Sequence, residues 1–256
     1  MLKKRVIPVL LLSEGRMVKG KQFESFRDTG KPNSAVRIYS AQDADELVFL
    51  DVEASRNKSS NQDSLISIIH SAAEECFMPL AAGGGVDSLE KVRELILAGA
   101  DKVVINSAAV KDPALITKAT EKFGNQSIVA GIDYKTSANE SKVWIESGTI
   151  ATELDPIEHA QNLVKSGAGE IFLNSIDRDG MMEGYDMITA NNIAKAVSVP
   201  VIVCGGAGNF MHLADLLSKT EASAAACASL FHFGDNSPIR ARSYLRNLGI
   251  PMRDLK

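Results

Sequence analysis

Short apolar segments recur along this chain and alternate with amphipathic ones. Each apolar segment is continuously apolar, which is typical of strands in a parallel sheet covered on both faces. The stretches between them have helical patterns: 88–98 ends at Gly99, and 156–166 begins at a proline and ends at Gly167. Alternating strand and helix units predict a closed (β/α)8 barrel, with a doubly wound sheet as the alternative. The predicted strands are 6–12, 47–51, 79–82, 102–106, 128–133, 170–174, 200–204 and 224–228.

The second half of the chain matches the first at an offset of 122 residues, the difference between Gly83 and Gly205. The match predicts one domain over residues 1–256, a barrel of two half-barrels at about 1–122 and 123–256. A hairpin is predicted over 136–150, inserted after the fifth strand. The same offset aligns Leu11 with Asp133, so one of two equivalent positions carries a carboxylate and the other does not. The matching pairs are Gly83-Gly84 with Gly205-Gly206, Asn106-Ser107 with Ala228-Ser229, and 6–10 with 128–132.

Composition excludes several classes of function. Apolar residues make up 45% and charged residues 23% of the 256, as in a globular protein with a large core. The net charge of −4 argues against a nucleic-acid partner. No segment approaches the ~20 apolar residues of a membrane span. The three distant cysteines predict a reducing cytoplasm and have no metal-ligand spacing; no metal or cofactor is expected.

Two glycine clusters, 82–85 and 204–208, follow predicted strands three and seven. In barrels the C-terminal ends of the strands carry the active site. Glycine lets backbone N–H groups approach phosphate oxygens, and a following helix N-terminus adds positive potential. Tight turns are the alternative reading, but two copies at matched spacing favour a ligand with a phosphate at each end. The candidate phosphate residues are Gly83, Gly84, Asn106 and Ser107 at one end and Gly205, Gly206, Ala228 and Ser229 at the other.

Three carboxylates stand near predicted strand ends. Asp51 ends the second strand, Asp133 ends the fifth, and Asp179 lies in the loop after the sixth. A carboxylate in this place can act as a general acid or base. Helix capping or a loop role is the alternative. Catalysis is favoured for Asp133, because an apolar strand has little structural use for a charge at its end.

The chain strongly resembles the HisF family, the cyclase subunits of imidazole glycerol phosphate synthase. The resemblance runs from Lys4-Arg5-Val6-Ile7 to Phe231-His232-Phe233 and implies a two-fold (β/α)8 barrel. It also implies a bis-phosphate substrate and a HisH-type glutaminase partner, which docks on the N-terminal face and delivers ammonia through the barrel. The motifs that carry it are Val18-Lys19-Gly20 and the segments 45–51, 99–103, 175–180 and 184–186.

The resemblance assigns roles to individual residues. It implies Asp133 and Asp179 in catalysis, Lys19 on a mobile loop over the substrate, and substrate contacts from Asp51, Asn174 and Gly180. It further implies an ammonia gate at the N-terminal ends of the strands. The gate residues are Arg5, Glu46, Lys102 and Glu170.

Leu11 departs from the family pattern, because the family has a second catalytic aspartate at this position. Asn174, Cys204 and Met181 are further departures near the site. The first hypothesis is the parent cyclase reaction. The second is a HisF-like branch in which delivered ammonia converts an acetamido sugar to an acetamidino sugar for surface polysaccharide. A non-catalytic barrel that activates a glutaminase and a related isomerase are two further alternatives.

Overall fold

The computed structural model describes residues 3–55, 62–138, 140–232 and 236–253. Phe233, at the end of the family resemblance, lies outside the described residues. Among the residues described, no helix is long and apolar enough to cross a membrane.

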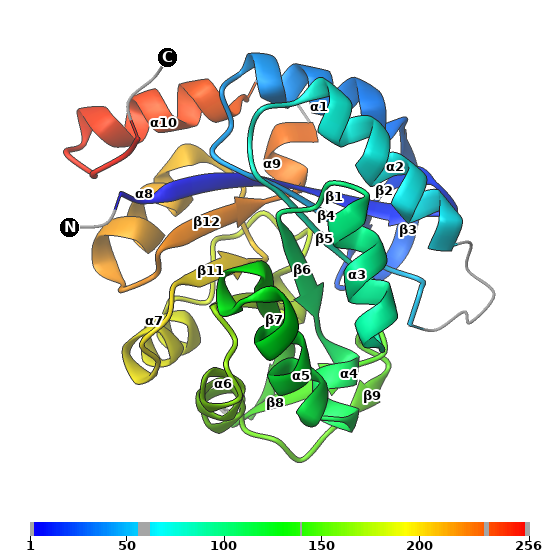
Figure 1. The fold of residues 1–256 in the computed structure, drawn as a ribbon. Coiled ribbons are helices and arrows are strands. Elements are labelled where there is room, and N and C mark those ends of the chain that lie inside the picture. Colours follow the sequence, from blue (N-terminus) through cyan, green and yellow to red (C-terminus); the bar gives the residue numbers. More distant parts are fainter. Residues whose placement is uncertain (1–2, 56–61, 139, 233–235, 254–256) are drawn as a thin grey trace.

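Parallel strands close into a barrel at the centre of the molecule (Figure 1). Neighbouring strands follow the order β10–β11–β12–β1–β4–β5–β6–β7, and β7 then pairs with β10, from Glu170 opposite Val129 to Ser175 opposite Tyr134. This confirms the predicted barrel and excludes the doubly wound sheet. The barrel strands are β1 (Arg5–Ser13), β4 (Leu47–Asp51), β5 (Leu80–Gly83), β6 (Lys102–Ile105), β7 (Ile128–Ser137), β10 (Glu170–Ser175), β11 (Val201–Cys204) and β12 (Ala224–Cys227).

Helices pack around the barrel because the outward side chains of the strands are apolar. Local signals set their ends: the Ser88 side chain accepts from the Lys91 amide at the start of α3, and Asp155 caps α6, which begins at Pro156. The predicted helices 88–98 and 156–166 are therefore confirmed. The helices are α1 (Pro32–Ala41), α2 (Gln62–Glu75), α3 (Leu89–Leu97), α4 (Ser107–Lys111), α5 (Ala114–Phe123), α6 (Pro156–Lys165), α7 (Met187–Ala196), α8 (Phe210–Lys219), α9 (Ser229–His232) and α10 (Pro238–Asn247), with short 3-10 turns at Asn125–Ser127 and Ile176–Arg178.

Two antiparallel hairpins extend from the C-terminal ends of β1 and β7. After β1, strand β2 (Arg16–Lys21) turns back onto it and pairs with β3 (Glu24–Gly30). After β7, strand β8 (Glu140–Ile145) pairs with the outer half of β7 and with the short β9 (Ile150–Ala151). The predicted hairpin is therefore present, and its first strand is the continuation of the barrel strand itself.

Candidate functional site

A ring of four charged side chains closes the N-terminal end of the barrel. Arg5 Nη1 lies 2.7 Å from Glu46 Oε2, and Lys102 Nζ lies 2.9 Å from Glu46 Oε2 and 2.8 Å from Glu170 Oε2. Arg5 also forms an ion pair with Glu170. Both carboxylates are buried, and burial raises the pKa of Glu46, although Lys102 and Arg5 oppose this. The residues predicted as an ammonia gate thus form one continuous ion-pair cycle.

Apolar side chains fill the barrel above this ring. They point inward from alternate positions of the strands, as β geometry requires. Val104 and Phe172, each two residues after a ring member, already line the cavity at the other end. The inward apolar residues of the barrel strands are Ile7, Val9, Leu11, Val48, Ala81, Val104, Val129, Phe172, Ile202, Cys204, Ala224 and Ala226, and Val18 of β2 packs against them.

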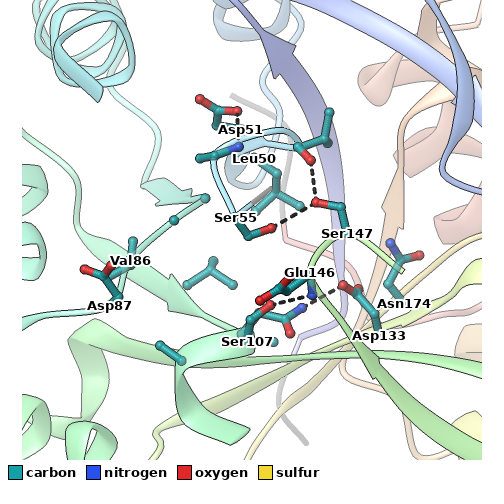
Figure 2. Close-up of a pocket in the computed structure, with 18 of the residues that line it drawn as sticks. Leu50, Asp51, Ser55, Val86, Asp87, Ser107, Asp133, Glu146, Ser147 and Asn174 are labelled. Atoms are coloured by element: carbon teal, nitrogen blue, oxygen red, sulfur yellow. Dashed lines mark hydrogen bonds between the residues drawn. The ribbon is translucent and has the colours of Figure 1, made fainter. Parts of the chain in front are cut away.

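A cavity of about 580 Å³ lies at the C-terminal ends of β1, β4, β5, β6, β7 and β10. Figure 2 shows Asp133, Ser107 and Glu146 close together, with Ser55 and Ser147 in contact across the opening. The sequence-predicted residues that line it are Leu11, Asp51, Gly84, Asn106, Ser107, Asp133 and Asn174.

Asp133 is the predicted carboxylate that the cavity places best for proton transfer. Asn106 Nδ2 donates a hydrogen bond of 2.7 Å to its Oδ2 atom. Burial raises the pKa of Asp133 to about 7; the Asn106 hydrogen bond opposes the shift and the charge of Asp179 adds to it. A carboxyl with this pKa is present in both protonation states near neutral pH, as a general acid or base requires.

Two amide oxygens near Asp133 have no hydrogen-bond partner among the residues that the structure describes. The Oδ1 atoms of Asn106 and Asn174 are buried and accept no hydrogen bond from any residue that the structure describes. Buried polar groups are normally paired, so these oxygens are acceptors open to a ligand or to water. Asp51 differs, because its Oδ1 atom accepts from the amides of Glu53 and Ala54 at 3.0 Å each.

The second predicted phosphate group does not line this cavity. Gly205 and Gly206 follow β11 with φ of +92° and +108°, and Ala228 and Ser229 follow β12. The β2–β3 hairpin packs on this side: the Gln22 amide donates to the Asp179 carbonyl at 2.9 Å, and Gly180 lies against the Gly20 backbone. The two predicted phosphate ends are therefore separated in this conformation. Gly83 is also outside the lining and packs against Val104 and Leu50.

Lys19 lies in the β2–β3 hairpin, which connects barrel strand β1 to α1, and its movement over a substrate stays a prediction. It belongs to β2, its side chain is buried, and Nζ is 3.4 Å from the Val9 carbonyl oxygen. Burial lowers its pKa to about 8, opposed by Asp179, whose own pKa burial raises to about 6. The charges of Lys19 and Asp179 each stabilise the ionised form of the other, and neither residue lines the cavity.

Sequence reasoning missed the residues that the hairpin tip brings to the cavity. Ser147 accepts or donates a hydrogen bond of 3.0 Å with Ser55, and the Glu146 amide donates to Ser107 Oγ at 2.9 Å. Glu146 also pairs with Lys111, at the end of α4. These contacts join segments far apart in the chain, and the only available signal was the predicted hairpin itself.

The fold and this cavity place the chain among the (β/α)8-barrel enzymes, with the site at the C-terminal ends of the strands. A family model described as "Histidine biosynthesis protein" matches residues 5–237. The chain is also 43% identical over 257 residues to the imidazole glycerol phosphate synthase subunit HisF of Trichormus variabilis, with 99% of both chains covered. The chain therefore belongs to the histidine biosynthesis protein family, and within it to the HisF type.

Proposed function

We propose that this chain is the cyclase subunit of an imidazole glycerol phosphate synthase in histidine biosynthesis. A HisH-type glutaminase partner releases ammonia, which crosses the barrel and reacts in the cavity with a phosphoribulosyl formimino carboxamide ribonucleotide. The products are imidazole glycerol phosphate and AICAR, the aminoimidazole carboxamide ribonucleotide. The family match supports this proposal, and the three free, buried cysteines are compatible with a reducing cytoplasm.

The observation that carries the proposal is the short axial path between the charged ring and the cavity. Lys102 and Asn106 lie four residues apart around β6, as do Glu170 and Asn174 on β10, which spans about 13 Å of extended chain. The inward side chains between them are apolar. Neutral ammonia crosses such a layer more readily than ammonium, because an apolar environment disfavours the charged form.

Proton transfer in the cavity falls to Asp133. Ammonia that adds to a carbonyl carbon must lose a proton, and the oxygen must gain protons to leave as water. Asp133 can accept and return protons near neutral pH because of its raised pKa. The Oδ1 atoms of Asn106 and Asn174, which accept no hydrogen bond from the described residues, can accept one from the incoming nitrogen or from substrate hydroxyls.

Coupling between glutamine and product tests the route through the ring. In the complex with the glutaminase, Lys102→Ala and Arg5→Ala should lower glutamine-dependent turnover, while turnover with added ammonium salt is retained. Lys118→Ala, on the exposed face of α5, is the matched control. Unchanged coupling in both ring variants would sink the proposed route.

Leu11 favours a second candidate function, in which ammonia reacts with an acetamido group of a sugar to give an acetamidino group. The leucine lines the cavity where the family has its second catalytic aspartate, and Asp51 is engaged by two loop amides. This reaction needs delivered ammonia but no ring closure. It predicts a wild-type barrel that binds the ribonucleotide substrate without turnover, whereas ordinary turnover would reject it.

A further inference from the structure

The tip of the β8–β9 hairpin places an internal anion at the Ser107 end of the cavity. The Glu146 amide donates to Ser107 Oγ at 2.9 Å, and the Glu146 carboxylate forms an ion pair with Lys111 Nζ. Ser107 is one of the predicted phosphate residues. Glu146 thus contacts a predicted phosphate residue through its backbone amide and holds a cation of the cavity wall through its carboxylate.

The charges that line the cavity leave no cation uncompensated for an incoming phosphate. Its lysines are Lys91 and Lys111, within the part of the chain that the structure describes. Lys91 Nζ lies 3.1 Å from Asp87 and donates to the Gly85 carbonyl at 2.9 Å, so it is already engaged. The lining carboxylates are Asp51, Asp87, Asp112, Asp133 and Glu146. Backbone N–H groups can bind a phosphate at this end, but the phosphate gains a cationic partner only if one of these lysines exchanges its carboxylate for it.

Lys111 is the lysine best suited to this exchange. Its side chain is 55% exposed, so it can reorient without leaving water, and its partner Glu146 is 27% exposed. The hairpin tip has left-handed φ angles at Glu146, Ser147 and Gly148 of 51°, 53° and 73°. Such a turn is held by its contacts rather than by backbone preference. Its polar contacts to the facing loop, through Ser147 to Ser55 and the Val52 carbonyl, can re-form with water.

We propose that Lys111 is a further anion-binding residue of this cavity and that Glu146 is its internal competitor. On binding, a ligand phosphate displaces the Glu146 carboxylate from Lys111 and takes a hydrogen bond from Ser107. No covalent bond changes. This inference rests on the proposed phosphate-bearing substrate and names the residues that select it at the Ser107 end.

Titration with inorganic phosphate, followed by amide NMR signals of Gly84 and Ser107, tests the exchange at this end of the cavity. Glu146→Gln should bind phosphate about 3- to 5-fold more tightly, and Lys111→Gln about 3- to 5-fold more weakly, as expected for a partly exposed ion pair. Glu153→Gln is the matched control, because Glu153 pairs with Lys142 on the same hairpin and does not line the cavity. In the double variant Glu146→Gln/Lys111→Gln, the gain in phosphate affinity from Glu146→Gln should disappear, because that gain depends on Lys111.

The outcomes separate the exchange from the proposed function. Phosphate binding to wild type with no change in Glu146→Gln, or a gain that persists without Lys111, overturns the exchange and leaves the phosphate-bearing substrate intact. No phosphate response in wild type or in any variant overturns both. Unaltered circular dichroism and thermal unfolding of the variants confirm that the compared proteins have the same fold.

Discussion

Replacing Asp133 by asparagine should make the protein more stable at neutral and alkaline pH while abolishing proton transfer. Burial raises the pKa of Asp133 from the ordinary 3.8 to about 7. At about 1.36 kcal/mol per unit, a shift of about three units corresponds to at most about 4 kcal/mol of destabilisation when the carboxylate is ionised. Water that enters the cavity reduces this value, so we expect about 2–4 kcal/mol.

The sign of the effect depends on pH. The folded state holds the Asp133 proton more tightly than the unfolded state does, so this group favours folding at low pH. Its contribution is lost as pH rises from about 4 through 7. Asparagine cannot ionise, and its Oδ1 atom can still accept the hydrogen bond from Asn106. The stabilisation by Asp133→Asn should therefore be small near pH 4 and full at pH 8.

Urea denaturation of wild type and Asp133→Asn, at pH 5 and at pH 8, measures this difference. Asp215→Asn is the control, because Asp215 is partly exposed on α8, pairs with Lys219 and does not line the cavity. Its effect should be below about 0.5 kcal/mol at both pH values. Equal stabilisation by Asp133→Asn at both pH values, or destabilisation at pH 8, would refute the reasoning.

Three further predictions concern neighbouring features. Asn106→Ala removes the hydrogen bond to the Asp133 carboxylate, so the pKa of Asp133 should rise by about one to two units. The limb of the pH–rate profile that Asp133 controls should shift to higher pH by the same amount. A limb that does not shift counts against Asp133 as the group that transfers the proton. Arg242→Ala should destabilise the fold by about 3–5 kcal/mol in urea, because the fully buried guanidinium lies 2.8 Å from the Asp43 carboxylate. Gly206→Ala should lower the free energy of unfolding in urea by about 2 kcal/mol or more, because the φ of Gly206 is +108° and a Cβ would lie 2.1 Å from the Gly184 carbonyl oxygen. A variant as stable as wild type contradicts this.

The barrel was predictable because its strands are buried on both faces. Segments such as 224–228 and 103–105 have no polar face, so continuous apolar character sufficed to find β12 and β6. The position of Asp133 at the cavity followed from the same logic, because it ends the predicted strand 128–133. The charged ring followed from the family resemblance, and the structure shows the four side chains in contact.

The strands of the β2–β3 hairpin, and the contacts made by the tip of the β8–β9 hairpin, could not be predicted from the sequence. Strand β3 is largely exposed and its residues are mostly polar, so no apolar alternation marks it in the sequence. The cavity wall formed by Ser55, Ser147 and Glu146 depends on how the tip of one hairpin packs against loops that are distant in sequence. Such contacts arise from tertiary packing, and local patterns carry no signal for them.

Ammonia-dependent turnover of the phosphoribulosyl formimino substrate, with wild type beside Leu11→Asp, tests the proposed cyclase most directly. Ammonium salt at high pH replaces the glutaminase, so the barrel is measured alone. We predict that wild type forms imidazole glycerol phosphate and AICAR at ordinary enzyme rates, with Asp133 handling the protons. Substrate binding without turnover in wild type, together with turnover in Leu11→Asp, would contradict the cyclase proposal and favour a different acceptor for the ammonia.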